Sequence, residues 1–154
     1  MKDISSVKGS LVVNIIKDGV IVKVIKQDNL VVTNGKNMLA TLLAGNNGGI
    51  THVRYGTSDA PVSADNTTIS NAVQVLISDN YLYPNEDTPV NCVKFRYTFD
   101  SATGNGITFK ECGLVDIAGT LFNRIVMNEP IVKDNTFSFE GFWTIEKIKK
   151  MANF

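Results

Sequence analysis

The first apolar stretches of the chain flank a short polar turn. LVVNIIK and VIVKVIK lie on either side of Asp18-Gly19, and Asp-Gly between two apolar runs is a strong signal for a two-residue type I′ turn. We therefore predict a β-hairpin over residues 10–26. Because pairing runs outward from the turn, the expected cross-strand partners are Lys17 with Val20, Ile16 with Ile21, Ile15 with Val22, Asn14 with Lys23, and Val13 with Val24.

In this register both faces of the hairpin are largely apolar. One face holds Leu11, Val13, Ile15, Val20, Val22 and Val24. The other holds Val12, Ile16, Ile21 and Ile25 around the polar pair Asn14 and Lys23. A face turned to solvent normally carries polar residues, so we expect the rest of the chain or a neighbouring subunit to cover the second face. Its four apolar residues form a candidate assembly face.

The segment after the hairpin has helical spacing. Met38, Leu39, Leu42 and Leu43 recur on one side of a 3.6-residue period, which predicts a short helix near residues 36–44. Thr33 or Asn34 is a candidate N-cap, and Gly45 can take the left-handed conformation that ends a helix.

From Ile50 onwards, apolar and polar residues alternate as in strands. The clearest example is the run in which Val93, Phe95, Tyr97 and Phe99 alternate with polar residues. Polar loops are expected over residues 56–70 and 78–91, and turns at Asn105-Gly106 and Ala118-Gly119 predict three strands in a meander. The remaining strand candidates are residues 50–55, 71–77, 107–117, 120–127 and 136–146.

The last of these strands carries Phe137, Phe139, Trp143 and Ile145 on one face, with Gly141 as a bulge or a point of close approach. It leads into a basic tail over residues 147–154, for which a helical turn or an extended arm is expected. About eight strands and one short helix favour an all-β, antiparallel β-sandwich or closed barrel over any α/β scheme. The length of 154 residues fits one domain over residues 1–154.

The charge balance argues against several classes of partner. Fifteen basic and fifteen acidic residues cancel, so no net field favours nucleic acid or an anionic membrane. The start, MKDISSVKGS, lacks an apolar stretch of signal-peptide length, and no later run approaches a membrane span. These features predict synthesis in a cytoplasm, where Cys92 and Cys112 are expected to be free thiols.

Candidate catalytic residues are few. His52 is the single histidine, so a triad or dyad would depend on that residue, and no GxSxG motif accompanies it. We expect His52 to be structural. Glu86 with Asp87, or Glu111 with Asp116, are the acid pairs that glycoside hydrolysis would require, but the first pair is typical of a solvated turn. We therefore predict no enzymatic activity and no cofactor.

Two sets of residues are candidate binding sites, each with a structural alternative. Oxygen ligands for calcium occur in polar segments, but their spacing does not match the twelve-residue calcium loop, and turn hydrogen bonds are the favoured interpretation. Tyr81 and Tyr83, two residues apart in SDNYLYPNED, are a candidate platform on which a sugar ring could stack. The candidate calcium ligands are Asp59, Asp65, Asn66, Asp79 and Asn80.

Four segments together resemble a family of small bacteriophage virion proteins of tail fibres, baseplates and other minor structural positions. They are NLVVTNG at Asn29–Gly35, GTSDAP at Gly56–Pro61, GITFKECGL at Gly106–Leu114 and TFSFEGFWTI at Thr136–Ile145. The resemblance covers about residues 29–145 and leaves the N-terminal hairpin outside it. It implies a β-sandwich module within a multiprotein particle, without enzymatic activity.

From these features we expect a virion structural protein, made in a host bacterial cytoplasm, that forms part of a tail, baseplate, fibre attachment or capsid surface. Its expected partners are other virion proteins and copies of itself. Two alternatives stay open: a receptor- or carbohydrate-binding module that meets a host-surface glycan, and a capsid decoration protein.

Overall fold

The chain folds into nine antiparallel strands and one short helix over the part that the structure describes. The structure is a computed structural model that describes residues 3–46, 48–85 and 88–151, with the side chains of residues 7–46, 48–80 and 92–146. The elements are β1 (Asp3–Lys17), β2 (Val20–Val31), α1 (Thr33–Leu43), β3 (Ile50–Gly56), β4 (Val73–Leu76), β5 (Asp79–Asn85), β6 (Thr88–Phe99), β7 (Thr108–Asp116), β8 (Asn123–Val132) and β9 (Ser138–Met151).

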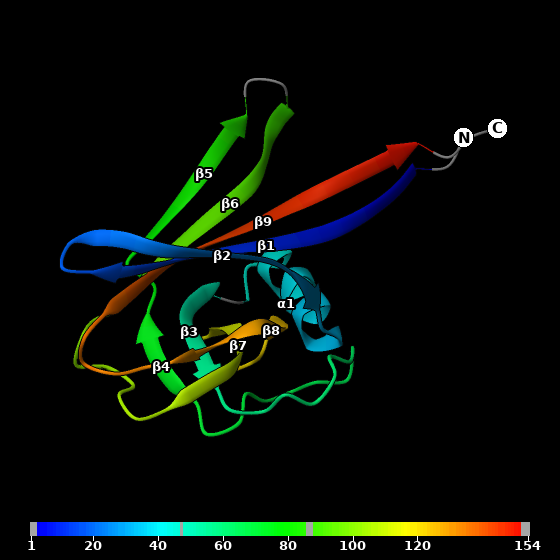
Figure 1. The fold of residues 1–154 in the computed structure, drawn as a ribbon. Coiled ribbons are helices and arrows are strands. Elements are labelled where there is room, and N and C mark those ends of the chain that lie inside the picture. The colour runs from blue at the N-terminus through cyan, green and yellow to red at the C-terminus, as the bar shows by residue number, and fades with distance from the viewer. Residues whose placement is uncertain (1–2, 47, 86–87, 152–154) are drawn as a thin grey trace.

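All nine strands belong to one curled sheet with the order β4-β3-β7-β8-β2-β1-β9-β6-β5. Figure 1 shows β2, β1, β9, β6 and β5 crossing above β3, β4, β7 and β8, with α1 between the two groups. The prediction of an all-β antiparallel fold with one short helix is confirmed. The architecture is a half-barrel and not a sandwich of two separate sheets, because Leu30 and Val31 of β2 pair with Arg124 and Asn123 of β8 and make the sheet continuous.

The order of strands corrects the predicted meander. β7 pairs with β8, but β6 pairs with β5 and β9, and β9 pairs with β1 and β6. Turn signals in the sequence correctly mark where the chain reverses, as at Gly106 and Gly119, both with positive φ. They do not determine which strands lie side by side, because β9 returns across the molecule to the N-terminal strand.

One segment expected to be a loop contains strands, and the basic tail, for which a helical turn or an extended arm was expected, is extended. The segment 78–91 contains β5 and the start of β6 in place of a polar loop, and β9 continues through Met151, opposite Asp3 of β1. The basic tail is therefore extended as far as it is described. In Figure 1 the outer ends of the β1–β9 and β5–β6 pairs project from the body as two-stranded ribbons. Because polar residues pair through their backbones as readily as apolar ones, composition alone did not reveal these strands.

The N-terminal hairpin forms with the predicted turn and a different register. Asp18 and Gly19 have φ values of 51° and 77°, as a type I′ turn requires. Lys17 pairs with Val20 and Ile16 with Ile21 as predicted, but Ile15 pairs with Lys23. Val22 is thus the extra residue of a β-bulge. Beyond it each β2 residue changes face relative to the prediction, since a slip of one residue reverses every side chain.

The helix begins three residues before its predicted start. Val32, and not Thr33 or Asn34, is the N-cap residue, and its side chain makes no capping hydrogen bond. The backbone N–H of Thr33 instead donates to the carbonyl oxygen of Ala64 at 2.9 Å. Gly45 has a φ of 75° and ends the helix as expected.

Aromatic residues fill the interior of the half-barrel. The predicted core face of β6 is confirmed, since Phe95, Tyr97 and Phe99 are buried. Their ring neighbours come from β3, β7 and β9, and the cluster consists of Tyr55, Tyr97, Phe99, Phe109 and Phe139. Gly141 of β9 is a point of close approach, because a Cβ atom there would lie 2.1 Å from Cζ of Tyr97.

Candidate interaction surface

The turn end of β2 exposes a run of β-branched side chains. Val20 is 62% exposed, Ile21 50%, Val22 57% and Val24 48%. Large apolar residues exposed singly are ordinary on a protein surface, whereas a contiguous group indicates a contact site. The bulge at Val22 contributes to this exposure, because it turns Val24 out of the core and brings Ile25 in, where Ile25 lies opposite Val13 and is buried.

The structure separates the four residues of the predicted assembly face. Val12 and Ile16 are half-buried and Ile21 is exposed on the same outer face, with Ile16 directly opposite Ile21. Ile25 lies on the opposite, core face and is not part of this surface. The correction follows from the bulge, which sequence periodicity alone did not indicate. Exposed Val24 takes the place of Ile25 on the outer face.

Beside this hairpin, charged side chains cover the outer face of the sheet. Phe142 of β9 lies opposite Val12, and the Nζ atom of Lys94 and the Cζ atom of Arg96 lie 5.0 Å and 6.0 Å from the centre of its ring. Arg96 also pairs with Glu140 at 3.2 Å. Apolar surface on β9 is therefore capped by cations, in contrast to the end of β2.

The far edge of β2 is joined to β8 through side chains over most of its length. Between described residues, the β2–β8 ladder consists of the Leu30–Arg124 and Val31–Asn123 pairs. Farther along, the side-chain amide of Gln27 donates to the Val126 carbonyl and accepts from the Asn128 N–H. Pro130 of β8 has no N–H to donate, which helps to explain why the ladder does not resume.

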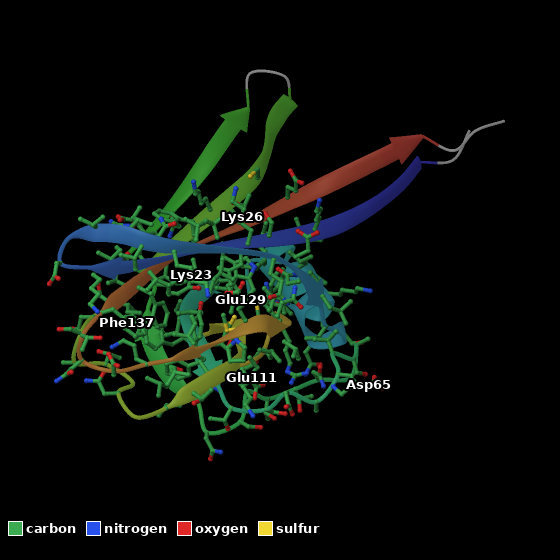
Figure 2. The ribbon with its side chains drawn as sticks, in the orientation of Figure 1. Lys23, Lys26, Asp65, Glu111, Glu129 and Phe137 are labelled. Atoms are coloured by element: carbon green, nitrogen blue, oxygen red, sulfur yellow. The ribbon has the colours of Figure 1, made fainter. Side chains whose placement is uncertain are left out.

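An ion pair adds to these side-chain contacts between β2 and β8. Lys23 of β2 and Glu129 of β8 form a salt bridge whose side chains are both 55% exposed, and Figure 2 shows the two residues near each other below β2. An exposed pair of this kind contributes little to stability. The main chain from Val20 to Val24 is therefore a strand edge without a backbone ladder to β8.

The polar site that sequence reasoning missed lies on the other side of β7. Glu111 was considered as an acid to be paired with Asp116, but its carboxylate is buried against Arg124 of β8, with Oε1 accepting from Nε at 3.0 Å. Glu111 Oε2 accepts from the backbone N–H groups of Ser58 and Ser70 at 2.6 Å and 3.2 Å. The carboxylate thus connects the strand to both ends of the 57–70 loop.

Arg124 holds the middle of the same loop. Its Nη1 atom donates to the carbonyl oxygens of Ala60 and Pro61 and to Oδ1 of Asn66 at 3.0, 3.4 and 3.1 Å. A loop was predicted over residues 56–70; Gly56 is the last residue of β3, and residues 57–70 contain no strand or helix. A loop of this length is uncommon in a compact domain and is often functional. Here one buried ion pair holds the loop at five residues, namely Ser58, Ala60, Pro61, Asn66 and Ser70.

Two small hollows lie beside α1, one between the helix and the 57–70 loop and the other between the helix and the turn that joins β7 to β8. One, of about 190 Å³, is lined by Thr33, Asn34, Ala64, Asp65, Asn66 and Thr67. The other, of about 340 Å³, is lined by Asn34, Asn37, Met38, Thr41, Asp116 and Thr120. Asn34 lines both hollows. Neither is lined by an aromatic side chain on which a sugar ring could stack.

The candidate catalytic residues do not converge. His52 lies in β3, half-buried, with Nδ1 2.8 Å from the hydroxyl of Thr51. Glu111 and Asp116 are five residues apart on one strand and so point to opposite faces. Asp116 accepts from the N–H groups of Ala118 and Thr120 and closes a turn.

Several predicted candidates lie wholly or partly outside the described residues. Glu86 and Asp87 are not described, and nor are the side chains of Tyr81 and Tyr83, whose backbones belong to β5. Of the oxygen ligands considered for calcium, Asn66 is engaged with Arg124 and with the N–H of Ser63. Among the described side chains, no group of three His, Cys, Asp or Glu residues is placed to hold a metal ion.

A buried group of two tyrosines and a thiol lies in the aromatic core. The hydroxyls of Tyr55 and Tyr97 are 2.6 Å apart. Burial, followed by the neighbouring Tyr97 and Cys112, raises the pKa of Tyr55 well above its usual value, and burial likewise raises the pKa of the Cys112 thiol. Both Cys92 and Cys112 are free. Since burial keeps these groups protonated and solvent does not reach them, they pack the core.

An apolar hollow of about 230 Å³ lies between α1 and the upper strands. Leu39 and Leu42 line its helix side, and Phe95 and Ile145 line its sheet side; the other lining residues are Gly48, Gly49, Ile50, Asn80, Val93 and Phe122. It is a gap between the helix and the sheet, and no titratable side chain lines it.

No helix among the described residues is both long enough and apolar enough to cross a membrane. The chain matches no protein-family model, and no match to it was found among curated proteins or among solved structures.

Proposed function

We propose that the chain is a non-enzymatic structural protein of a bacteriophage virion, and that it acts through contacts with other virion proteins and with copies of itself. The observation that carries this proposal is the exposed β-branched end of β2, from Val20 to Val24, which adjoins a strand edge without a backbone ladder. Such an edge is normally covered or blocked in a protein that works alone.

The two projecting ribbons favour the same role. Residues 3–8 of β1 pair with β9, and the β1–β2 ladder starts at Gly9. At the other ribbon, the β6–β9 ladder starts at Cys92, beyond which β5 and β6 pair with each other. A two-stranded ribbon is marginally stable in water by itself. Packing against neighbouring subunits in a particle would stabilise both ribbons.

The segments that resemble phage virion proteins supply the scaffold of this fold. Gly56–Pro61 is bound by Glu111 and Arg124, and Asn29 accepts a hydrogen bond from the indole N–H of Trp143 at 2.6 Å. These contacts fix the positions of loops and strands relative to one another. The residues of the resembling segments therefore contribute to the fold. The role in a tail, baseplate, fibre attachment or capsid surface rests on the resemblance.

Localisation in intact particles tests the proposal. Phage particles purified from the source culture should contain the chain at a fixed number of copies per particle by quantitative mass spectrometry, and labelled antibodies should bind at one repeated position. Absence of the chain from purified particles would contradict the proposal. Binding to a glycan array by the purified chain would instead support the receptor- or carbohydrate-binding alternative.

A further inference from the structure

The turn that joins β6 to β7 contains an Asn-Gly pair, a dipeptide prone to spontaneous deamidation. In such a pair the backbone nitrogen of the glycine can attack Cγ of the asparagine side chain, because glycine has no side chain to hinder the approach. Asn105 and Gly106 are both exposed to solvent, and Gly106 has a φ of 84°, which favours glycine. The turn is therefore a candidate site of covalent modification.

Lys133 contacts both residues of this pair. Its carbonyl oxygen accepts a hydrogen bond from the Gly106 N–H at 2.9 Å, and its Nζ atom donates to Oδ1 of Asn105 at 2.8 Å. The other side of the asparagine amide is also held, since Nδ2 of Asn105 donates to the Ser101 carbonyl at 2.9 Å. The attacking nitrogen and the amide under attack are thus both engaged in hydrogen bonds.

The Lys133 side chain is itself fixed in place. It lies in the connection between β8 and β9, yet Lys133 is 1% exposed. Its Nζ atom also donates to the Asp134 carbonyl at 2.8 Å and lies 5.3 Å from the centre of the Phe137 ring, a residue labelled in Figure 2. Because a buried donor that loses its acceptor costs free energy, the contact with Asn105 resists opening.

We propose that Asn105–Gly106 is a deamidation site that Lys133 keeps closed in the folded chain. In the reaction the Gly106 nitrogen forms a bond to Cγ of Asn105, the bond from Cγ to Nδ2 breaks, and the proton of the Gly106 N–H leaves with Nδ2 as ammonia. Water then opens the succinimide to aspartate or isoaspartate. The attack requires the Gly106 N–H and the Asn105 side chain to be released, and hence a local opening of the turn. This inference does not depend on the proposed function.

Two effects of the Lys133 side chain oppose each other. A donor to Oδ1 draws electron density from Cγ and would assist the attack, whereas the same bond holds the asparagine side chain within the turn. The bond from the Gly106 N–H makes the second effect the stronger, because solvent base does not remove a proton that is bonded to a carbonyl oxygen. Loss of the Lys133 side chain should therefore speed the reaction.

Peptide mapping by mass spectrometry of the full chain, incubated at mildly alkaline pH, tests the inference. Asn105 in Lys133→Met should deamidate about tenfold faster than in the parent chain, since the loss of a hydrogen bond of this kind shifts local opening by about that factor. Lys110→Met is the matched control, because the Lys110 side chain is 40% exposed and does not contact the pair. Its rate at Asn105 should equal that of the parent chain.

A second Asn-Gly pair separates a local effect from a general loss of structure. Asn34 and Gly35 lie in α1, where the Gly35 N–H donates to the Val32 carbonyl at 3.0 Å. Deamidation of Asn34 should not change in Lys133→Met. A rise at Asn34 equal to that at Asn105 would show that the variant loses the fold as a whole, and would contradict a local role for Lys133.

A comparison within the parent chain does not rely on any variant. Asn105 should deamidate at least about tenfold more slowly in the folded chain than in the same chain unfolded in urea, because the folded turn must first open. Equal rates in the folded and unfolded chain would overturn the inference, as would slower deamidation of Asn105 in Lys133→Met.

Discussion

Glu111 and Arg124 form an ion pair whose side chains are 1% and 3% exposed, with Arg124 Nε 3.0 Å from Glu111 Oε1. The two side chains project from β7 and β8 on the face that the 57–70 loop covers. Cys112 and Ile125, the next residues along the two strands, face the aromatic core on the other side. Burying two charges costs so much solvation that the pair adds little net stability. The pair instead specifies one loop conformation, since Glu111 and Arg124 together receive or donate hydrogen bonds along the whole loop.

We expect the removal of either partner to destabilise the fold strongly. Glu111→Leu leaves a buried guanidinium and Arg124→Met leaves a buried carboxylate, and each should lower the free energy of unfolding by about 3–5 kcal/mol. The double variant should lose less than the sum of the two, because neither charge is then left alone. Urea unfolding of the parent chain, the two single variants and the double variant measures the interaction free energy between Glu111 and Arg124.

Lys110, next to Glu111 in β7, provides a control for the Glu111 and Arg124 variants. Lys110 lies 3.8 Å from Asp59, and their side chains are 40% and 78% exposed, so Lys110→Met should cost at most about 1 kcal/mol. Limited proteolysis should cut the 57–70 loop faster in Glu111→Leu than in Lys110→Met. Equal stability losses at Glu111 and Lys110 would contradict the role given to the buried pair.

The close approach of β9 to Tyr97 predicts a strong effect of one added methyl group. In Gly141→Ala the new Cβ would lie 2.1 Å from Cζ of Tyr97, so the ring must shift within a packed aromatic cluster, at a cost of about 1–3 kcal/mol. A Cβ at Gly48 meets nothing within 4 Å, and Gly48→Ala should therefore change stability little. Thermal unfolding should show a lower midpoint for Gly141→Ala and an almost unchanged midpoint for Gly48→Ala. Equal midpoints would contradict the close approach at Gly141.

The two thiols should differ in reactivity. Burial raises the pKa of both thiols, but Cys112 is fully buried whereas Cys92 is partly exposed to solvent. Since the thiolate is the reactive form, iodoacetamide at neutral pH should modify Cys92 in the folded chain and reach Cys112 once urea unfolds it. Mass spectrometry of peptic fragments identifies each site. Modification of Cys112 at the same rate as Cys92 would show that the core opens readily.

Two turn aspartates predict a loss of stability in acid. Hydrogen bonds from Thr103 and Ala102 lower the pKa of Asp100, and bonds from Thr136 lower the pKa of Asp134, relative to 3.8. The unfolded chain therefore binds more protons just below pH 3.8, so stability present above that pH falls as these carboxylates protonate. Urea midpoints measured from pH 5 to pH 2 should fall less steeply for Asp100→Asn/Asp134→Asn than for the parent chain.

The register of the hairpin shows where prediction from sequence reached its limit. Asp18-Gly19 determines the turn and the first two pairs, because few residues tolerate two successive positive φ values. The bulge at Val22 follows from how β1 and β2 pack on the core, where Val13 and Ile25 meet. Three of the four residues proposed for the outer face are on it, and Ile25 is not.

The buried Glu111–Arg124 pair could be predicted from sequence only in part. Glu111 lies in an otherwise apolar strand and Arg124 follows Leu121 and Phe122 in another, and a charged residue at a position that should be buried is a signal for a partner. The pairing itself required β7 and β8 to be neighbours in the register that places Glu111 opposite Val126 and Cys112 opposite Ile125. Interpreting the acids as possible catalysts missed it, because no signal in the sequence identified which strands adjoin.

The sequence by itself determined what local physics controls. Alternation indicated the core face of β6, the turn residues marked the chain reversals, and the 3.6-residue spacing indicated the helix, since each depends on backbone preferences and on burial over a few residues. Tertiary structure alone decided the strand order, the curl into a half-barrel, the bulge, and the exposure of Val20–Val24. Those features depend on contacts between segments far apart in the chain, such as β1 with β9, and several pairings satisfy the same local pattern until the whole core is packed.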